Sequence, residues 1–386
     1  MTPGARVAAA IGIIDQIKSG VAAEKALTAW ARSSRFAGSK DRAAVRDHVF
    51  DVLRAKRSLG DGDGRSLMMR LLARDGHDLD ACFNGQGHAP SPLTADERMA
   101  SKAPLQLSEA AAHDLPDWLW PLWVESLGDA AKVAALTLQT RADVFLRVNM
   151  RRASVAQVTS ALAAEDIAVA PHEDIKGCLR VTQNARRVKA STPFADGLVE
   201  LQDAASQFAV QAVPVEQGAR VLDYCAGGGG KALAFADLHD AAVFAHDIAP
   251  KRMADLPVRA ARAKVDVTRV ATADLPRQAP FDVVFCDAPC SGSGTWRRTP
   301  DAKWQLTPDR LATLQKMQAQ VLDQAAPLVA PGGRLIYATC SVLRAENEAV
   351  IARFVDKSRD WQIDTQFRLL PGSCGDGFFL CNMVQK

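Results

Sequence analysis

The spacing of apolar residues changes twice along the chain, and these changes predict three parts. Over residues 1–125 apolar positions recur at helical spacing, which favours an all-helical domain. Residues 128–213 combine short apolar runs with one helical pattern, which is typical of a small α+β segment; we expect strands at 144–148 and 177–181 around a helix at 154–163. From 214 to 386, short apolar runs alternate with helices, as in a separate α/β domain.

The third part predicts a doubly wound, Rossmann-like sheet. Strands are expected at residues 219–224, 242–247, 267–271, 281–287 and 334–339. Helices are expected at residues 231–238, 250–263, 308–326 and 345–355. Because the strand segments are apolar runs, the sheet should be parallel and covered on both faces. Right-handed crossovers would then place ligands at the carboxyl ends of the strands.

The composition is that of a globular chain, with 386 residues of which 48% are apolar and 24% charged. The eight cysteines form no CxxC pair, which argues against a zinc site or a disulfide framework. Reduced thiols indicate a cytoplasmic protein. No stretch approaches the ~20 apolar residues that span a bilayer, and the apolar run 7–14 continues as a helix instead of ending in a signal-peptide cleavage site. We expect no membrane contact, no metal and a monomer.

Charge is concentrated locally, although the formal net charge is only +3. Between Arg6 and Arg57 there are eleven Lys or Arg and five Asp or Glu. This excess suits a nucleic-acid phosphate backbone, and a solvated helix surface is the alternative. The second part carries a further basic group, consisting of Arg147, Arg151, Arg152, Arg186, Arg187 and Lys189.

A glycine loop, Asp223–Lys231, follows the first strand of the third part and opens a helix. Glycines let the backbone approach a ligand closely. A phosphate-binding P-loop would need glycine at 225 and Ser or Thr at 232, where the chain has Cys225 and Ala232. A dinucleotide fingerprint fits locally, with Asp247 at the right distance to hold a ribose. A tight turn without a ligand is the third possibility.

S-adenosylmethionine fits the loop better, because it has an adenosine ribose but no phosphate. Asp247 would accept hydrogen bonds from the ribose hydroxyls, with Arg252 as its neighbour, and Asp274 would contact the adenine amino group. Lys231 would reach a carboxylate, which the amides of a helix N-terminus also favour. The predicted cofactor-binding residues are Cys225, Ala226, Gly227, Gly228, Gly229, Gly230, Lys231, Asp247, Arg252, Asp274 and Asp287.

Two cysteines follow the ends of two later strands. Cys290 comes shortly after Asp287, and Cys340 comes directly after Thr339, so both thiols are expected at the ligand-binding edge. Cys286, inside its strand, is expected to be an inert buried thiol.

A pair of thiols suits methylation at carbon 5 of a cytosine. If a thiolate adds to carbon 6, carbon 5 gains enamine character and can attack a methyl group. One cysteine can attack and the other can assist release of the product. A free thiol is only a few per cent ionised at pH 7, so helix dipoles or cations such as Lys231, Arg297 or Arg298 would raise the thiolate fraction. Asp287 can bond the ring-edge nitrogens of the base.

Together these stretches resemble the RsmB/Sun family of RNA 5-methylcytosine methyltransferases. The similarity covers about residues 140–386, in the order Glu200–Gln207, Asp223–Lys231, Asp287–Gly294, Arg297–Asp301, Thr339–Ser341, Glu346–Glu348 and Asp376–Phe379. The resemblance implies that Cys340 is the nucleophile, that Cys290 helps to eliminate the product, and that Asp287 acts in the same site. The family commonly has Ala-Pro or Gly-Ala at Gly227-Gly228 and Thr at Ala232, which puts the fine geometry of the loop in doubt.

The N-terminal helices resemble, more weakly, a NusB-like RNA-binding domain, which implies small-subunit ribosomal RNA as the substrate. The target base must be unpaired or flipped out, and Trp296, Arg297, Arg298 and Trp304 could stack against it. Core packing is the alternative for the tryptophans. The competing functions are a tRNA or DNA cytosine-5 methyltransferase, a non-catalytic RNA-binding factor and a nicotinamide-dependent oxidoreductase. In the DNA case the roles of Cys290 and Cys340 would reverse.

Overall fold

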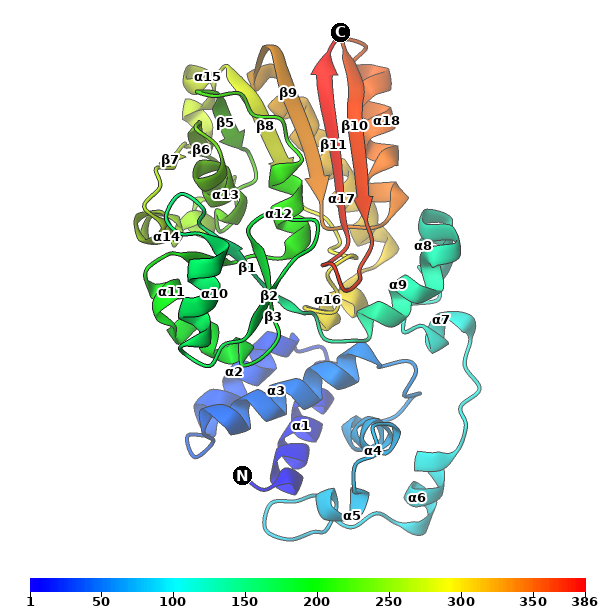
Figure 1. Cartoon of the computed structure of the whole chain (residues 1–386). Helices are drawn as coiled ribbons and strands as arrows, with labels where there is room; N and C mark the ends of the chain where they lie inside the picture. The colour runs from blue at the N-terminus through cyan, green and yellow to red at the C-terminus, as the bar shows by residue number, and fades with distance from the viewer. The chain divides into compact units, whose positions relative to one another are not determined.

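A seven-stranded sheet organises the larger of two compact units (Figure 1). The computed structural model describes residues 1–386. One unit, the helical unit, comprises Met1–Arg141 with Trp296–Leu306, and the other, the sheet unit, comprises Ala142–Thr295 with Thr307–Lys386. Most of the second and third predicted parts therefore share one unit, except residues 128–141 and 296–306. The finer limits 1–125, 128–213 and 214–386 stay a prediction.

The strand order of the large sheet is β10-β11-β9-β8-β5-β6-β7. Its strands are β5 (Arg220–Asp223), β6 (Ala242–Ala245), β7 (Thr268–Arg269), β8 (Phe281–Asp287), β9 (Val329–Thr339), β10 (Trp361–Leu369) and β11 (Phe378–Gln385). The pairings among the five strands β5 to β9 are all parallel, which confirms the predicted Rossmann-like sheet. The order reverses between β5 and β8, so the ligand-binding crevice of such a sheet is expected at their carboxyl ends.

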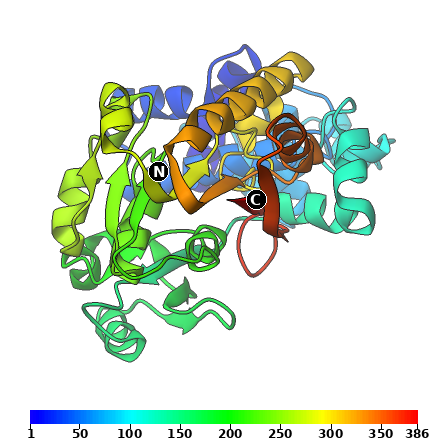
Figure 2. The ribbon, with the colours of Figure 1, turned by 90° about the horizontal axis from the view of Figure 1, so that it is seen from above.

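Alternate side chains of the parallel strands face two separate cores. Leu222, Val284 and Tyr337 pack on one face, covered by α17 (Pro308–Ala325) and α18 (Glu348–Lys357), which lie side by side in Figure 2. Their neighbours along the strands pack on the other face, against α12 (Ala204–Gln211), α13 (Gly230–Leu238) and α14 (Leu256–Ala263). Both faces are buried, which explains why the strand segments are apolar throughout. The short helix α15 (Leu275–Gln278) precedes β8.

Two antiparallel strands at the C-terminal edge were missed by the sequence analysis. β11 pairs antiparallel with both β9 and β10. The run Phe378–Met383 is buried and contributes to both cores. No helix lies between β10 and β11. The hairpin therefore does not follow the alternation of strands and helices from which the other strands were predicted.

A smaller antiparallel sheet precedes the large one in the same unit, with the order β2-β3-β1-β4. The predicted strands and helix appear as β1, β3 and α10, with Leu146, Leu179 and Leu162 in their common core. The elements are β1 (Val144–Val148), α10 (Val155–Ala163), β2 (Val169–Pro171), β3 (Cys178–Val181), α11 (Thr192–Ala195) and β4 (Val199–Leu201).

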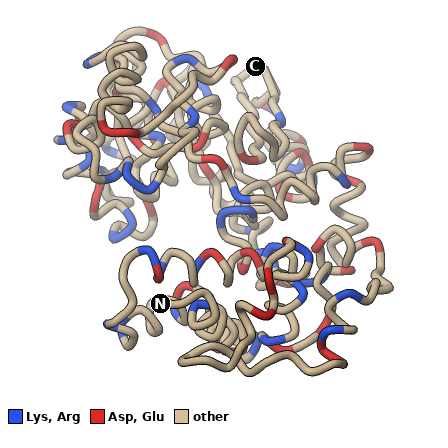
Figure 3. Tube along the Cα trace, turned by 60° about the horizontal axis from the view of Figure 1, so that its bottom comes forward, with Lys and Arg blue, Asp and Glu red and all other residues tan.

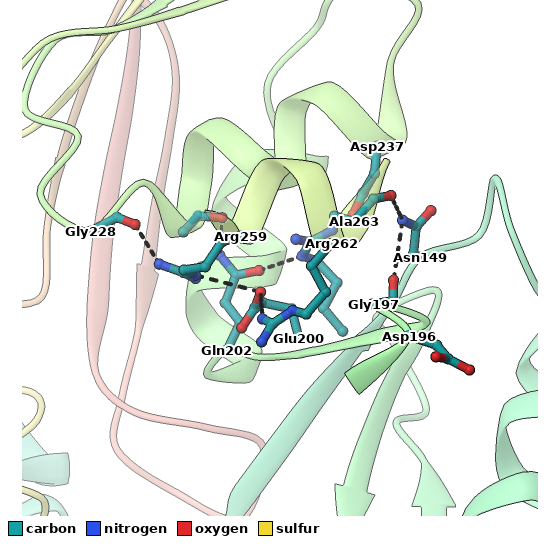
Figure 4. A network of polar contacts seen from close by, with 12 residues as sticks. Asn149, Asp196, Gly197, Glu200, Gln202, Gly228, Asp237, Arg259, Arg262 and Ala263 are labelled. Atoms are coloured by element: carbon teal, nitrogen blue, oxygen red, sulfur yellow. Dashed lines mark hydrogen bonds and ion pairs between the residues drawn. The ribbon is translucent and has the colours of Figure 1, made fainter. Parts of the chain in front are cut away.

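The small sheet is joined to helices α13 and α14 by buried polar contacts (Figure 4). Arg147 of β1 is 3% exposed and forms an ion pair with Asp237 of α13. Burial lowers the pKa of Arg147 to about 10, so the guanidinium stays charged at neutral pH. Asn149 Nδ2 donates to the carbonyl of Ala263, 2.8 Å away. The prediction that Arg147 meets a phosphate is therefore wrong, because its charge is used inside the unit.

The helical unit is built from nine α-helices before residue 141 and one short helix from later in the chain. The helices are α1 (Pro3–Lys18), α2 (Ala23–Ser33), α3 (Ser39–Arg54), α4 (Gly64–Arg74), α5 (Leu79–Cys82), α6 (Ala95–Lys102), α7 (Glu109–Ala112), α8 (Trp120–Leu127), α9 (Ala131–Leu138) and α16 (Pro300–Gln305). Trp296 is fully buried and stacks on Trp123, with ring centroids 6.1 Å apart. Trp304 donates its Nε1–H to the carbonyl of Leu53. Core packing, the alternative for these tryptophans, is what the structure shows, and Trp296 has no face open for an RNA base.

Acidic and basic residues are interspersed along the helical unit (Figure 3). Several of the basic residues before residue 58 are paired internally, which reduces the excess available to phosphate; the pairs include Arg6–Asp41, Arg46–Glu24, Arg54–Asp51 and Arg57–Asp117. None of the helices combines the length and the apolar character that crossing a membrane requires.

Candidate active site

The carboxyl ends of β5, β6, β8 and β9 lie next to one another in the large sheet. Asp223 at the end of β5 is level with Phe285 of β8, and Asp287 at the end of β8 is level with Ala338 of β9. The predicted cofactor-binding residues and the two predicted catalytic cysteines each follow one of these strands or β7, except Asp287, which ends its strand. The sheet therefore gathers segments that are up to 117 positions apart along the chain, from Asp223 to Cys340.

The glycine loop forms a tight turn between β5 and α13. The Gly229 amide donates to the carbonyl of Ala226 at 2.7 Å, and Gly229 has a positive φ of 77°. A Cβ at this position would lie 2.4 Å from Cδ1 of Leu256 in α14. Glycine is required here both by the backbone conformation and by the packing of the neighbouring helix.

Asp247, which follows β6, shapes the loop from one side. Its Oδ2 accepts a hydrogen bond from the Gly227 amide at 2.9 Å and lies 3.1 Å from a guanidinium nitrogen of Arg252. Its Oδ1 accepts from the Ala249 amide. The next residue, Ile248, is 81% exposed, although it is large and apolar. Sequence reasoning missed Ile248, whose only signal was an apolar residue directly after a strand-end acid.

Residues of the small sheet and of α14 hold the loop from the other side (Figure 4). Arg259 donates to the carbonyl of Gly228 and lies 3.5 Å from a carboxylate oxygen of Glu200 in β4. Gln202 Nε2 donates to the carbonyl of Gly230 at 3.2 Å. None of these three side chains was predicted to act, although Glu200–Gln207 was one of the stretches that carried the family resemblance.

Lys231 and Asp287 form a partly buried ion pair, with Nζ 2.6 Å from Oδ2. Burial opposes the positive charge, but the interaction with Asp287 outweighs it, and the pKa of Lys231 is raised. The ammonium also interacts electrostatically with Asp223 and Cys340. In this structure Lys231 therefore meets a carboxylate of the protein itself, and it stands between the glycine loop and Cys340.

Asp223 is a buried carboxylate that sequence reasoning left without a role. No hydrogen bond from another side chain reaches either of its oxygens. Burial raises the pKa of Asp223 to about 7, and Lys231 opposes that shift. A buried acid of this kind is a common feature of functional sites, because a cationic ligand can supply the missing partner.

Cys290 and Cys340 come together at the ends of β8 and β9. Their sulfur atoms are 3.4 Å apart, within hydrogen-bonding distance, and both residues are partly exposed. The hydrogen bond with Cys340, together with burial, raises the pKa of Cys290 well above the ordinary value. Cys290 is therefore a protonated thiol beside the Cys340 sulfur. Cys286 is fully buried and its pKa is raised by burial, which agrees with an inert thiol.

The remaining predicted residues lie in less specific surroundings. Asp274 is half exposed and pairs with Arg277 one turn later. Burial raises the pKa of Cys225, so this thiol stays neutral within the loop. Arg297 and Arg298 belong to the helical unit, where Arg297 is buried. Nowhere do three or more His, Cys, Asp or Glu side chains cluster in a way that could hold a metal ion.

Two family models match the chain. Residues 210–382 match the model described as 16S rRNA methyltransferase RsmB/F. Residues 115–188 match the ferredoxin-like domain of RsmF/B-like methyltransferases. The small antiparallel sheet lies largely in this second range.

Curated relatives and solved structures agree with these models. The chain is 30% identical to the probable ribosomal RNA small subunit methyltransferase B of Bacillus subtilis, over 73% of this chain and 68% of that protein. It is 32% identical to ribosomal RNA small subunit methyltransferase B of Cronobacter sakazakii, over 72% and 69%. The crystal structure of PH0851 covers 100% of this chain and 99% of its own, with TM-score 0.77 and 21% identity. A methyltransferase homologue from Pyrococcus horikoshii covers 72% and 97%, with TM-score 0.63 and 22% identity.

Proposed function

This chain belongs to the RsmB/F family of 16S rRNA methyltransferases, and we propose that it transfers a methyl group from S-adenosylmethionine to carbon 5 of a cytosine in small-subunit ribosomal RNA. The observation that carries the proposal is the 3.4 Å approach of the Cys290 and Cys340 sulfurs beside the glycine loop. Two adjacent thiols serve a reaction in which one sulfur bonds to the base and the other assists its release.

The residues around the glycine loop fit S-adenosylmethionine. No other side chain donates a hydrogen bond to the buried oxygens of Asp223, which suits a contact with the ammonium group of the methionine part. Ile248 presents an exposed apolar side chain next to Asp247, as contact with an adenine ring would require. Position 232, where a phosphate-binding loop would have Ser or Thr, is alanine. S-adenosylmethionine needs no such residue, because it carries no phosphate. When bound, this cofactor supplies an electrophilic methyl group on a sulfonium.

Cys340 is the nucleophile in this mechanism. Its thiolate adds to carbon 6 of the cytosine and the carbon 5–carbon 6 electron pair moves to carbon 5. Carbon 5 then takes the methyl group, and the electron pair of the broken sulfur–methyl bond would stay on the sulfur of S-adenosylhomocysteine. The positive charge of Lys231 interacts with Cys340, so Lys231 is the cation that the mechanism assigns to this sulfur. Asp287, held by Lys231, can accept a hydrogen bond from the exocyclic amino group of cytosine, which uracil lacks.

Cys290 is the general base for release. Its raised pKa has the neighbouring Cys340 sulfur as its largest cause. Once that sulfur is bonded to carbon 6 it carries no negative charge, so the pKa of Cys290 falls and Cys290 can ionise. The Cys290 thiolate then removes the proton from carbon 5, the double bond re-forms, and the Cys340 thiolate leaves. The same two sulfurs thus exchange roles within one turnover.

The test is methyl transfer to defined nucleic acids. The full chain is incubated with tritiated S-adenosylmethionine and, separately, with 16S rRNA, assembled small subunits, bulk tRNA and duplex DNA, and the products are digested to nucleosides. We expect 5-methylcytosine in 16S rRNA or the small subunit only. Methyl transfer to tRNA alone would show that the substrate is tRNA and not ribosomal RNA. Cofactor binding without methyl transfer to any of these nucleic acids would overturn the proposal.

Bisulfite sequencing identifies the position. Total RNA from a strain that lacks this protein should lose protection at one cytosine of 16S rRNA relative to the parent. Re-expression of the intact chain should restore it, and re-expression with Cys340→Ala should not.

A further inference from the structure

One carboxylate lies beneath both cysteine-bearing loops. Glu346, at the end of the short 3₁₀ helix Arg344–Glu346, is fully buried. Its Oε1 accepts hydrogen bonds from the Ser291 amide at 2.8 Å and from Gln318 Nε2 at 3.0 Å. Its Oε2 accepts from the hydroxyl of Ser341 at 2.6 Å and from the hydroxyl of Ser291. Four donors therefore converge on one buried negative charge.

Each of the two serines is the immediate neighbour of a thiol. Ser291 follows Cys290 after β8, and Ser341 follows Cys340 after β9. The two loops lie fifty residues apart in sequence, and they are also joined by the Ser293–Ser341 hydroxyl contact at 2.8 Å. Because the donors come from both loops, the position of Glu346 constrains the distance between the two sulfurs.

The charge of Glu346 also distinguishes the two thiols. Glu346 contributes to the raised pKa of Cys290, after the Cys340 hydrogen bond and burial. Lys231 interacts electrostatically with Cys340. Tyr337, which also faces Cys290, has its own pKa raised by burial and is neutral. The negative charge of Glu346 disfavours ionisation of Cys290 and so keeps the proton on this sulfur.

We propose that Glu346 is a positioning residue that holds the two sulfurs at reacting distance and, together with Lys231, decides which of them becomes the thiolate. The catalytic consequence rests on the proposed methyl transfer, but the effect on the thiols does not and can be measured without RNA. Within the stretch Glu346–Glu348, the proposal gives this role to Glu346 alone.

Two substitutions separate the charge from the geometry. Glu346→Gln removes the charge, while its amide can still hold both serines if their hydroxyls rotate. Glu346→Ala removes both. Glu348→Gln is the matched control, because Glu348 pairs with Arg368 and touches neither serine. The probe is iodoacetamide, with the alkylated fraction of Cys290 and of Cys340 followed by mass spectrometry from pH 6 to 10.

In the unsubstituted chain and in Glu348→Gln, Cys340 should be alkylated at lower pH than Cys290. In Glu346→Gln the midpoint for Cys290 should fall by about one pH unit, which corresponds to about a tenfold rise in its thiolate fraction at fixed pH. The kcat for methylation should fall about tenfold in the same variant, while the KM for S-adenosylmethionine stays unchanged. An unaltered order and midpoint of alkylation in Glu346→Gln would overturn the proposal.

The rate of disulfide formation reports how closely the two sulfurs approach each other. The oxidant is diamide, which takes up the two hydrogens as the thiols form a disulfide. Glu346→Ala should form the Cys290–Cys340 disulfide at least several-fold more slowly than Glu346→Gln. If Glu346→Ala does not fold, Ser341→Ala serves in its place. It removes one of the four bonds to Glu346 together with the Ser293–Ser341 contact between the loops. Equal rates in the folded variants would rule out the positional part. A wild-type chain that alkylates as expected but methylates no RNA would refute the proposed function and leave the role of Glu346 standing.

Discussion

The two ends of the candidate site are held in place by different means. The glycine loop is continuous in sequence and is braced from outside, by Asp247 on one side and by Arg259 and Gln202 on the other. The cysteine pair joins two loops fifty residues apart and is held from below by the buried carboxylate of Glu346. The difference indicates a division of work between the two ends. Substitutions in the glycine loop should change the affinity for S-adenosylmethionine, and substitutions of the cysteines should change the rate of methyl transfer.

The largest effect expected is at Cys340. Cys340→Ala removes the nucleophile, so methylation should fall by at least about a thousandfold, the scale of losing a covalent step. No covalent protein–RNA complex should form, and S-adenosylmethionine should bind as before. Measurement of methyl transfer, denaturing gels for the adduct and calorimetric titration of the cofactor separate these outcomes.

Cys290→Ala should also stop turnover, but at a later step. The adduct through Cys340 forms and is methylated, and it then persists because no base removes the carbon 5 proton. A protein–RNA complex that survives denaturation should therefore accumulate to about one per enzyme. If the complex instead accumulates in Cys340→Ala and is absent in Cys290→Ala, the roles of the two thiols are reversed.

Asp247→Ala tests the loop end and should leave the cysteine chemistry intact. The variant loses a charge-assisted hydrogen bond to the Gly227 amide and the partner of Arg252. Such bonds contribute about 1.5–3 kcal/mol, so the affinity for S-adenosylmethionine should fall by about 10- to 100-fold. Alkylation of Cys340 by iodoacetamide should be unchanged, and a loss of thiol reactivity here would show that the two ends are not independent.

Arg259→Gln should have a smaller effect of the same kind. Arg259 reaches the Gly228 carbonyl from outside the loop, and it is partly exposed. We expect the KM for S-adenosylmethionine to rise about three- to tenfold with kcat unchanged, the loss of roughly one ordinary hydrogen bond. Arg187→Gln, which breaks the surface pair with Asp166, is the control and should match the parent. A fall in kcat alone would contradict the division of work.

The smallest effect expected is on stability and concerns Asp223. Its pKa is about 7 in the folded chain and about 3.9 in an unfolded chain. The folded chain therefore binds the extra proton between these values, and the free energy of unfolding falls as the pH rises from about 4 to about 7. Asp223→Asn should flatten this part of the stability curve, so its Tm should exceed that of the parent by a few degrees at pH 8 and by less at pH 5. Identical pH dependence of Tm in both proteins would contradict this account.

Features that follow from local pattern could be predicted. The parallel strands were expected because both of their faces are apolar, and the ends of β5, β6, β8 and β9 place the glycine loop, Asp247 and the two cysteines on one edge by topology alone. The family resemblance named the same residues. The roles of these residues stay predictions until the variants above are measured.

Other features depended on partners that are distant in sequence. Arg147 was predicted to contact phosphate because it lies in a basic segment, but it forms an ion pair with Asp237 of α13. Trp296 follows the Cys290 loop along the chain, yet its ring is buried against Trp123. The spacing of residues along the chain could not predict that Glu346 accepts hydrogen bonds from two loops. The donors Ser291 and Ser341 follow different strands and are fifty residues apart.

The sequence by itself determined the parallel strands of the large sheet, the glycine loop after the first of them and the two thiols that follow later strands. It did so because apolar runs, glycines and cysteines can be located from their positions along the chain. Only the tertiary structure decided which charges remain available, how far apart the two sulfurs lie and which buried acids surround them. The physical reason is that the energy of a charge or a thiol is set by its neighbours in space, and folding brings those neighbours from segments that share no local pattern.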